Sequence, residues 1–211
     1  MSADAHVYPY SERPEVAALV PASVKRLLDV GCSRGGFGAA LLRTRPGLHM
    51  VGIEADADAA HEAAAHYAEV ITGTFPDHLP RDRTYDCIVF NDVLEHLVDP
   101  WAALRTAAEL LEPNGTVLAS IPNVRGLRNL IDLTVRGEWQ YVEMGILDRT
   151  HLRFFTRRSM VRLFEESGYE IDRIHGIFPL GSRWHVAPIL TRLLRDISYL
   201  EFVVVARSRH Q

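Results

Sequence analysis

The sequence contains only two cysteines, Cys32 and Cys87, and no run of 18 apolar residues. Each cysteine lies in an apolar stretch, outside any spaced metal or disulfide pattern, so we expect both to be reduced and buried. The missing apolar run excludes a membrane-spanning helix. The first residues have neither the basic flank nor the apolar stretch of a secretory signal. We therefore expect a cytoplasmic protein.

Positive charge is scarce in the first 120 residues, which hold 9 Lys and Arg against 17 Asp and Glu. Residues 121–211 have the opposite balance, 14 against 10. The net charge of -4 argues against nucleic-acid binding, because phosphate neutralisation needs a basic face. The split favours a cationic ligand in the first part and an anion-tolerant substrate side in the second, although solvated surface charge explains most such asymmetries.

Strand-like and helix-like stretches alternate from residue 27 onward, which is typical of an α/β fold around a mostly parallel sheet. The predicted strands are 27–31, 49–54, 69–72, 85–90, 116–121, 169–178 and 199–206. The predicted helices are 36–45, 57–67, one that begins at Pro100, 127–135, 157–167 and 186–194. At 211 residues without a linker-like tract, we expect a single domain over 1–211, with its core in 24–178 and 197–207 and an acceptor-side insertion at about 122–155.

A glycine-rich turn, DVGCSRGG, follows the first predicted strand at residues 29–36. Small residues there let the backbone approach a ligand closely, and the first N–H groups of the next helix can hold a carboxylate or phosphate. Glu54 follows Gly31 by 23 positions, at the end of the next strand, where a carboxylate can accept both ribose hydroxyls. Together they predict a nucleoside cofactor at the carboxyl edge of the sheet. A tight turn without a ligand is the alternative.

Four segments in this order resemble the class I S-adenosylmethionine-dependent methyltransferases. They are LLDVGCSRGG (27–36), GIE (52–54), YDCIVFNDVLEHLVDP (85–100) and LEPNGTVLASIPN (111–123). The resemblance implies a Rossmann-like, doubly wound, mostly parallel seven-stranded sheet with a C-terminal antiparallel strand and helices on both faces. It also implies S-adenosylmethionine as the cofactor.

The resemblance assigns cofactor contacts by position. The methionine end falls to the glycine-rich turn, the ribose to the next strand, and the floor under the sulfonium to the residues after the fourth strand. Adenine contacts fall after the third strand, where Thr74 replaces an acid that many members have, and Ser33 replaces a usual glycine. The expected cofactor-binding residues are Asp29, Gly31, Cys32, Ser33, Gly35, Glu54, Thr74, Phe75, Asn91 and Asp92.

The competing cofactor is NAD, because Gly31, Ser33 and Gly36 imitate a degraded dinucleotide signature. Asp29, two residues before the first glycine, would disfavour a nearby pyrophosphate and suits an ammonium. The acidic first part of the chain also suits a cationic cofactor. S-adenosylmethionine is therefore the preferred interpretation.

Two histidines are candidates for a general base, which an alcohol acceptor would need as its oxygen is methylated. His151 precedes a helix capped by Thr156, and Asp148 is its expected orienting partner. His96 follows the fourth strand, and we expect its neighbour Glu95 to pair outward. A hydrogen-bonded loop role for His151 and a bracing role for His96 are the alternatives. The spacing of the histidines predicts no metal site.

The segment DRTHLRFFTRRSMVRLFEESGY (148–169) resembles the equivalent part of small bacterial methyltransferases that accompany glycosyltransferases and act on sugars or related glycans. The resemblance implies a hydroxyl of a small polar, carbohydrate-type or acidic acceptor. The expected substrate-binding residues are Asn123, Trp139, Tyr141, Arg149 and Arg153. N- or C-methylation of another metabolite, a cofactor-binding scaffold without turnover, and a homodimer remain open.

Overall fold

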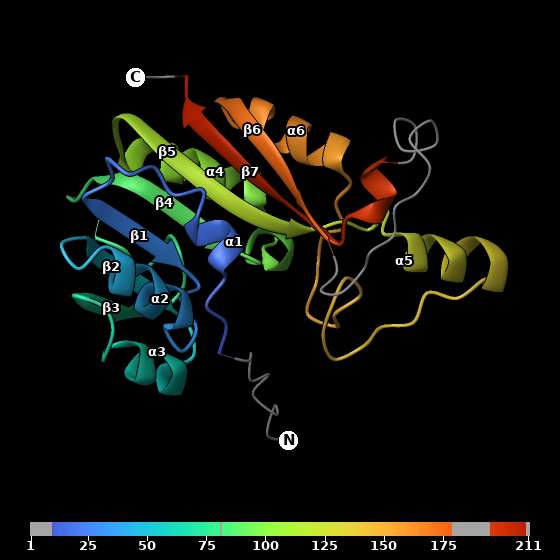
Figure 1. The fold of residues 1–211 in the computed structure, drawn as a ribbon, viewed down its shortest axis with the longest axis horizontal. Coiled ribbons are helices and arrows are strands. Elements are labelled where there is room, and N and C mark those ends of the chain that lie inside the picture. Colours follow the sequence, from blue (N-terminus) through green and yellow to red (C-terminus); the bar gives the residue numbers. More distant parts are fainter. Residues whose placement is uncertain (1–9, 81, 179–194, 210–211) are drawn as a thin grey trace.

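A seven-stranded sheet forms the centre of the computed structural model, which describes residues 10–80, 82–178 and 195–209 (Figure 1). The strand order is β3-β2-β1-β4-β5-β7-β6. The strands are β1 (Arg26–Val30), β2 (His49–Glu54), β3 (Glu69–Thr72), β4 (Tyr85–Asn91), β5 (Leu111–Pro122), β6 (Tyr169–Ile177) and β7 (Glu201–Ser208). Strand β7 is antiparallel to both of its neighbours, and the pairs from β3 to β5 are parallel. This topology confirms the predicted Rossmann-like fold.

Helices cover both faces of the sheet, as predicted (Figure 1). They are α1 (Pro14–Ala17), α2 (Gly36–Thr44), α3 (Ala57–Ala63), α4 (Pro100–Leu110), α5 (Leu127–Ile131) and α6 (Arg157–Glu166). The short turns are η1 (Leu94–His96), η2 (Asp132–Arg136) and η3 (Arg195–Ser198). One core cluster joins α1, α2 and α3 to one face, and a second joins α4 and α6 to the other. Because strands β1 and β4 are buried on both faces, they are almost continuously apolar.

Side-chain caps explain where three of the helices begin. The carboxylate of Asp56 accepts from the Ala59 N–H at the start of α3. Asp99 does the same for α4, whose first residue, Pro100, needs no hydrogen-bond donor there. Thr156 and the third residue of α6 cap each other reciprocally. These signals were readable in the sequence, and the predicted helix starts are confirmed.

Several element boundaries differ from the prediction, and the structure explains two of these differences. Helix α3 ends at Ala63 instead of continuing to Tyr67, because the chain leaves the helix and brings the Tyr67 side chain under the glycine-rich turn. Strand β5 begins at Leu111 instead of residue 116, and the Pro-Asn-Gly turn lies in a bulge where the register against β4 shifts. The predicted helix 186–194 falls outside the described residues.

The segment between β5 and α6 extends beyond the sheet, and α5 stands away from the main body (Figure 1). It leaves at Asn123 and returns at Phe155, which form a parallel bridge with each other. The predicted insertion therefore begins and ends at one place, next to the carboxyl ends of β4 and β5. No helix in the described part of the chain is long and apolar enough to span a membrane.

Candidate functional site

The glycine-rich turn between β1 and α2 has the left-handed backbone that glycine favours. Gly31 has φ of 70° and Gly35, the residue before α2, has φ of 82°. The Gly31 N–H donates to the Ile53 carbonyl at 2.8 Å, which ties the turn to β2. A Cβ on Gly31 would lie 2.7 Å from the side chain of Val93. The chain is thus too close-packed here for a larger residue.

Glu54 lies at the end of β2, beside this turn. Its carboxylate accepts from the N–H of Ser33 at 2.8 Å and from the N–H of Asp56 at 2.9 Å. Ser33 itself has φ of 46°. The position is the one predicted for a ribose contact, and the same carboxylate also fixes the shape of the glycine-rich turn.

Asp29 is a buried carboxyl near the end of β1, beside the glycine-rich turn. Its side chain is 1% exposed, and Oδ2 accepts a 2.5 Å hydrogen bond from the hydroxyl of Tyr67. The same hydroxyl accepts from the N–H of Gly38 in α2. Burial raises the pKa of Asp29 to about 7, while the Tyr67 bond opposes this shift. The other carboxylate oxygen, Oδ1, is buried and has no hydrogen-bond partner among the described residues, so the ammonium contact of Asp29 stays a prediction.

Cys32 is buried in the turn, as expected, and its sulfur fills the space beside Gly52. On the adenine side, Thr74 is exposed and its N–H donates to His78. The ring of Phe75 is 9% exposed and packs edge-on against Phe90. Phe75 consequently offers mainly its backbone, and its adenine contact stays a prediction.

Asn91, the last residue of β4, and Asp92, which follows it, stand at the predicted floor of the site. The amide oxygen and nitrogen of Asn91 are both buried, and within the described ranges neither has a hydrogen-bond partner. Asp92 has φ of 52°, and its carboxylate binds the Ser120 hydroxyl at 3.0 Å and the Arg13 guanidinium at 2.7 Å. An unpaired buried amide is costly unless a ligand or water completes it.

Arg13 is a site residue that the sequence analysis missed. Besides Asp92, its guanidinium pairs with Glu15 at 2.9 Å and closely with Glu201 in β7. A Cβ on Gly36 would meet the backbone of Ser11 at 2.5 Å, so the segment before α1 lies on the glycine-rich turn. Arg13 is one of few basic residues in an acidic stretch of the sequence. That contrast is the sequence feature that could have marked it as a site residue.

The two candidate bases lie together. The rings of His96 and His151 are 4.7 Å apart between centroids and nearly perpendicular. Nδ1 of His151 is 3.0 Å from the Ile146 carbonyl, and Nδ1 of His96 is 3.0 Å from the Thr150 hydroxyl. Burial lowers the pKa of His96, and the neighbouring His151 adds to the effect.

Of the two expectations about the acids beside these histidines, the one for Glu95 is wrong. Asp148 uses Oδ1 to hold the N–H and the hydroxyl of Thr150, and the Ile146 carbonyl contacts Nδ1 of His151, so the orienting role of Asp148 stays a prediction. Glu95 does not pair outward, because its carboxyl is 1% exposed and Oε1 lies 3.9 Å from Nε2 of His151. Glu95, His96 and His151 offer donor atoms within 4.8 Å of one another, a compact cluster that histidine spacing did not predict.

The predicted acceptor-side residues divide into two groups. Trp139 and Tyr141 gather around Phe154, with ring centroids 5.2 and 6.3 Å from it, and His151 lies 6.3 Å from the same ring. The sequence analysis did not predict a site role for Phe154, although this residue lies within the segment 148–169. The aromatic group therefore extends from the insertion to the candidate base.

The polar acceptor-side residues have partners within the protein. The Arg149 guanidinium pairs with Glu143 at 2.7 Å, and Arg153 donates to the Val98 carbonyl. Asn123 is fully buried, and its amide bonds three backbone groups. The predicted substrate role of Asn123 is therefore corrected, since its polar atoms join β5 to the segment before β7.

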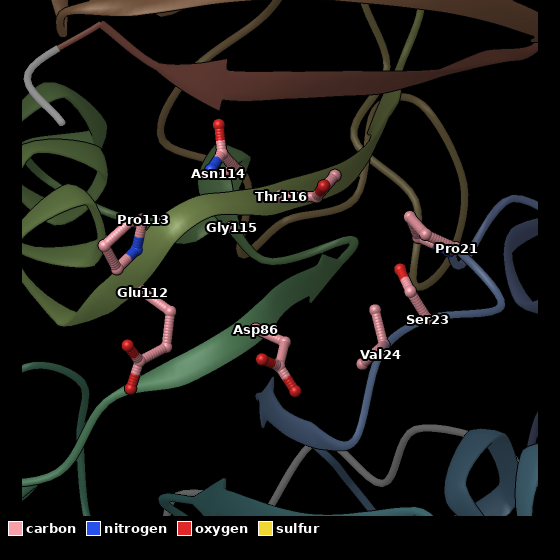
Figure 2. Close-up of a pocket in the computed structure, with 9 residues that line it drawn as sticks. All are labelled: Pro21, Ser23, Val24, Asp86, Glu112, Pro113, Asn114, Gly115 and Thr116. Atoms are coloured by element: carbon pink, nitrogen blue, oxygen red, sulfur yellow. The ribbon is translucent and has the colours of Figure 1, made fainter.

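A separate cavity of about 230 Å³ opens at the amino ends of β4 and β5, opposite the site (Figure 2). Asp86 and Glu112 contribute carboxylates to its wall. The Asp86 carboxylate already accepts from the N–H groups of Lys25 and Arg26, both at 2.7 Å. Asp86 thus fixes the start of β1. The cavity lies away from the residues predicted to bind the cofactor.

The profile of a family described as a methyltransferase domain matches residues 5–174. The chain belongs to this family. The methyltransferase is 26% identical over 193 residues to a ubiquinone biosynthesis O-methyltransferase of Aeromonas salmonicida. The match covers 85% of this chain and 76% of the relative. A protein of the same description from Nitrobacter winogradskyi is 29% identical over 187 residues, or 83% of this chain and 67% of the relative.

Among solved structures, a SAM-dependent methyltransferase from Archaeoglobus fulgidus has a TM-score of 0.66 and 17% identity, and the match covers 92% of each chain. The family and the fold together confirm the expectation of a class I S-adenosylmethionine-dependent methyltransferase. NAD is no longer the competing cofactor.

The geometry fits S-adenosylmethionine. The left-handed glycines leave a backbone surface without side chains at the start of α2, where the helix N–H groups can hold a carboxylate. Asn91 supplies an unpaired buried amide at the floor, and Glu54 supplies a carboxylate at the ribose position. The methyltransferase would hold the cofactor with these groups, while Asp29 shapes the turn.

Proposed function

We propose that this methyltransferase transfers the methyl group of S-adenosylmethionine to a hydroxyl oxygen of a small polar acceptor, with His151 as the general base. The observation that carries the proposal is the 3.0 Å contact between Nδ1 of His151 and the Ile146 carbonyl. Because a carbonyl only accepts, Nδ1 holds the proton in the neutral ring and Nε2 keeps the lone pair. A neutral imidazole fixed in this way is suited to take a hydroxyl proton.

The acceptor class follows from the aromatic group around Phe154. Trp139, Tyr141 and His151 each lie against Phe154, and sugars stack their apolar faces on aromatic rings of this kind. A carbohydrate-type acceptor is the class we favour. The second candidate is a hydroxyl on a ring of a quinone precursor, supported by relatives that are described as ubiquinone biosynthesis O-methyltransferases.

The protein's own groups have three tasks in this reaction. The cofactor supplies a sulfonium-activated methyl group, so the leaving group needs no protonation. Asn91 and the glycine-rich turn hold the donor in one orientation, and the aromatic group holds the acceptor, which is the proximity contribution. His151 takes the hydroxyl proton at Nε2 as the oxygen is methylated.

The test is a panel of nucleotide sugars and glycosides beside a panel of dihydroxybenzoates, with formation of S-adenosylhomocysteine as the readout. For acceptors that the wild type methylates, we expect His151→Gln to reduce transfer by roughly 100-fold or more while cofactor affinity stays unchanged. His175→Gln, on the exposed edge strand β6, is the matched control.

Undiminished transfer by His151→Gln would refute the assignment of the base. Methylation confined to nitrogen or carbon atoms would refute transfer to oxygen. If the wild type binds the cofactor but methylates no acceptor in either panel, the scaffold alternative is favoured and the proposal is wrong.

A further inference from the structure

Glu95 is a carboxyl that the fold encloses without pairing. It is 1% exposed, and neither carboxyl oxygen has a hydrogen-bond partner among residues 10–80, 82–178 and 195–209. Burial raises its pKa well above the usual range, and the acidic neighbours Asp92 and Glu201 add to this while Arg13 opposes it. A buried ionisable group without a partner is costly, so its presence calls for an explanation.

The Glu95 carboxyl lies next to the free side of the His151 ring. Oε1 is 3.9 Å from Nε2, too long for a hydrogen bond but close enough for a strong electrostatic interaction. Because Nδ1 is committed to the Ile146 carbonyl, Nε2 is the nitrogen that gains or loses a proton. The gap leaves Nε2 uncommitted and places a carboxyl beside any charge that forms on it.

The arrangement is held by the backbone as well as by side chains. The N–H groups of Leu152 and Arg153 both donate to the Glu95 carbonyl at 2.9 Å. The turn after β4 and the segment that carries His151 are therefore fastened directly to each other. The separation between the carboxyl and the imidazole is a property of this fastening and not of a flexible surface pair.

We propose that Glu95 is a positioning residue for His151, whose ionised carboxylate compensates the imidazolium that forms when Nε2 takes the acceptor proton. The inference rests on the proposed function. In the step, the acceptor O–H bond breaks and its proton moves to Nε2. The oxygen bonds to the methyl carbon, and the electron pair of the broken carbon–sulfur bond stays on sulfur. The sulfonium becomes a neutral thioether, and the positive charge is then on the His151 imidazolium, which pairs with the Glu95 carboxylate.

This role makes the reaction sensitive to pH. The active form combines ionised Glu95 with neutral His151, and its population grows as the pH rises because burial raises the pKa of Glu95 well above its usual range. The charged and titratable groups that face the pair are Asp92 after β4, Glu201 on β7, Arg13 before α1 and His96 on η1. Replacing Glu95 by glutamine preserves the shape and removes the ionisation.

The first measurement needs no acceptor. In the full chain labelled at histidine, the ring signal of His151, assigned with His151→Gln, is followed by NMR against pH. We expect the wild-type signal to change in two steps, because ionisation of Glu95 alters the field at the ring, and Glu95→Gln to show one. Glu165→Gln, an exposed acid on α6, is the control and should keep both steps. Superimposable curves for wild type and Glu95→Gln would overturn the proposal.

The second measurement uses the acceptor of highest turnover from the panels. We expect Glu95→Gln to lower kcat by roughly 10-fold or more, leave the KM for the cofactor unchanged, and lose the part of the rise of kcat with pH that comes from ionisation of Glu95. Glu95→Asp, which retains a carboxyl, should partly recover this second ionisation in the pH profile of kcat. If Glu95→Gln does not fold, the protein is labelled at glutamate instead. The titration of the Glu95 carboxyl is then compared between the wild type and His151→Gln. A carboxyl titration unaffected by the loss of His151 would contradict the pairing.

Two further outcomes separate the proposals from each other. If His151→Gln retains full transfer, the proposed function fails. If His151→Gln loses transfer but the Glu95→Gln profile keeps the wild-type shape, only the role of Glu95 fails. Loss of transfer on treatment with EDTA, with recovery on addition of Zn²⁺ or Mg²⁺, would show that a cation and not a proton links Glu95 to His151, and would overturn the inference.

Discussion

The hydroxyl of Tyr67 donates a 2.5 Å hydrogen bond to the carboxylate of Asp29, 38 residues earlier in the chain. This contact joins the end of the α3 segment to β1 directly beneath the glycine-rich turn. It also explains why the chain leaves α3 at Ala63. The shape of the cofactor site thus depends on a pair of side chains that are enclosed by the protein.

The first prediction concerns the pH dependence of stability. The pKa of Asp29 is about 7 in the folded protein, above its usual value of 3.8, so the folded state binds more protons than the unfolded state between these limits. Stability from this group is therefore present below about pH 4 and is lost as the pH rises through about 7. We expect Asp29→Asn to flatten the decline by about 1–3 kcal/mol, measured by urea unfolding at several pH values. A decline as steep as that of the wild type would contradict the burial argument.

The second prediction concerns Glu54. Its carboxylate accepts from the N–H groups of Ser33 and Asp56, at the position where we predict the ribose contact. We expect Glu54→Ala to weaken binding of S-adenosylhomocysteine by roughly 10-fold or more, measured by calorimetry. Glu62→Ala, which removes only a surface pair with Arg34, should bind as the wild type does. Equal affinities for the two variants would rule out the assignment of Glu54.

The third prediction separates backbone strain from steric overlap. Gly31 and Gly137 have nearly the same φ, 70° and 67°, but a Cβ would lie 2.7 Å from Val93 at Gly31 and in open space at Gly137. We expect Gly137→Ala to cost about 1 kcal/mol from backbone strain alone. Gly31→Ala should cost at least about 1 kcal/mol more and should also reduce cofactor affinity. Thermal unfolding of both variants measures the difference, and equal losses would show that the turn yields without cost.

The fourth prediction concerns Asn123. Its buried amide bonds three backbone groups, and alanine would leave them unsatisfied. We expect Asn123→Ala to lower the free energy of unfolding by about 2–4 kcal/mol, measured by urea denaturation. Arg128→Ala, at a side chain that is 93% exposed, should change it by less than about 0.5 kcal/mol. A stable Asn123→Ala variant with a raised KM for the acceptor would instead restore the substrate role.

The sequence predicted the order and type of the elements well because local signals agree with the fold. Asp56, Asp99 and Thr156 cap helices where the pattern placed them, and the doubly buried strands are long apolar runs. Boundaries failed where a distant contact decided them. Tyr67 leaves the helical pattern for a partner on another strand, which no local preference reveals.

The candidate site was predicted in part for the same reason. Residues that act through the backbone, such as Gly31 and Gly35, were readable from a local motif. The partner of the Asp29 carboxylate was not readable, because only the packing brings in the Tyr67 hydroxyl from 38 residues later in the chain. The burial of Glu95 was not readable either. In a short turn, a shift of one residue decides whether a carboxyl faces solvent or the interior.

The position of β7 has a consequence for how the chain is assembled during synthesis. Among the described strands, β6 has β7 as its sole neighbour, and β7 separates it from β5. When the ribosome has made residue 177, β6 therefore has no place in the sheet and stays unpaired until residues 201–208 emerge. The closing strand completes two ladders at once, so the growing chain exposes an unfinished edge at β5 until nearly all of the residues described here have been translated.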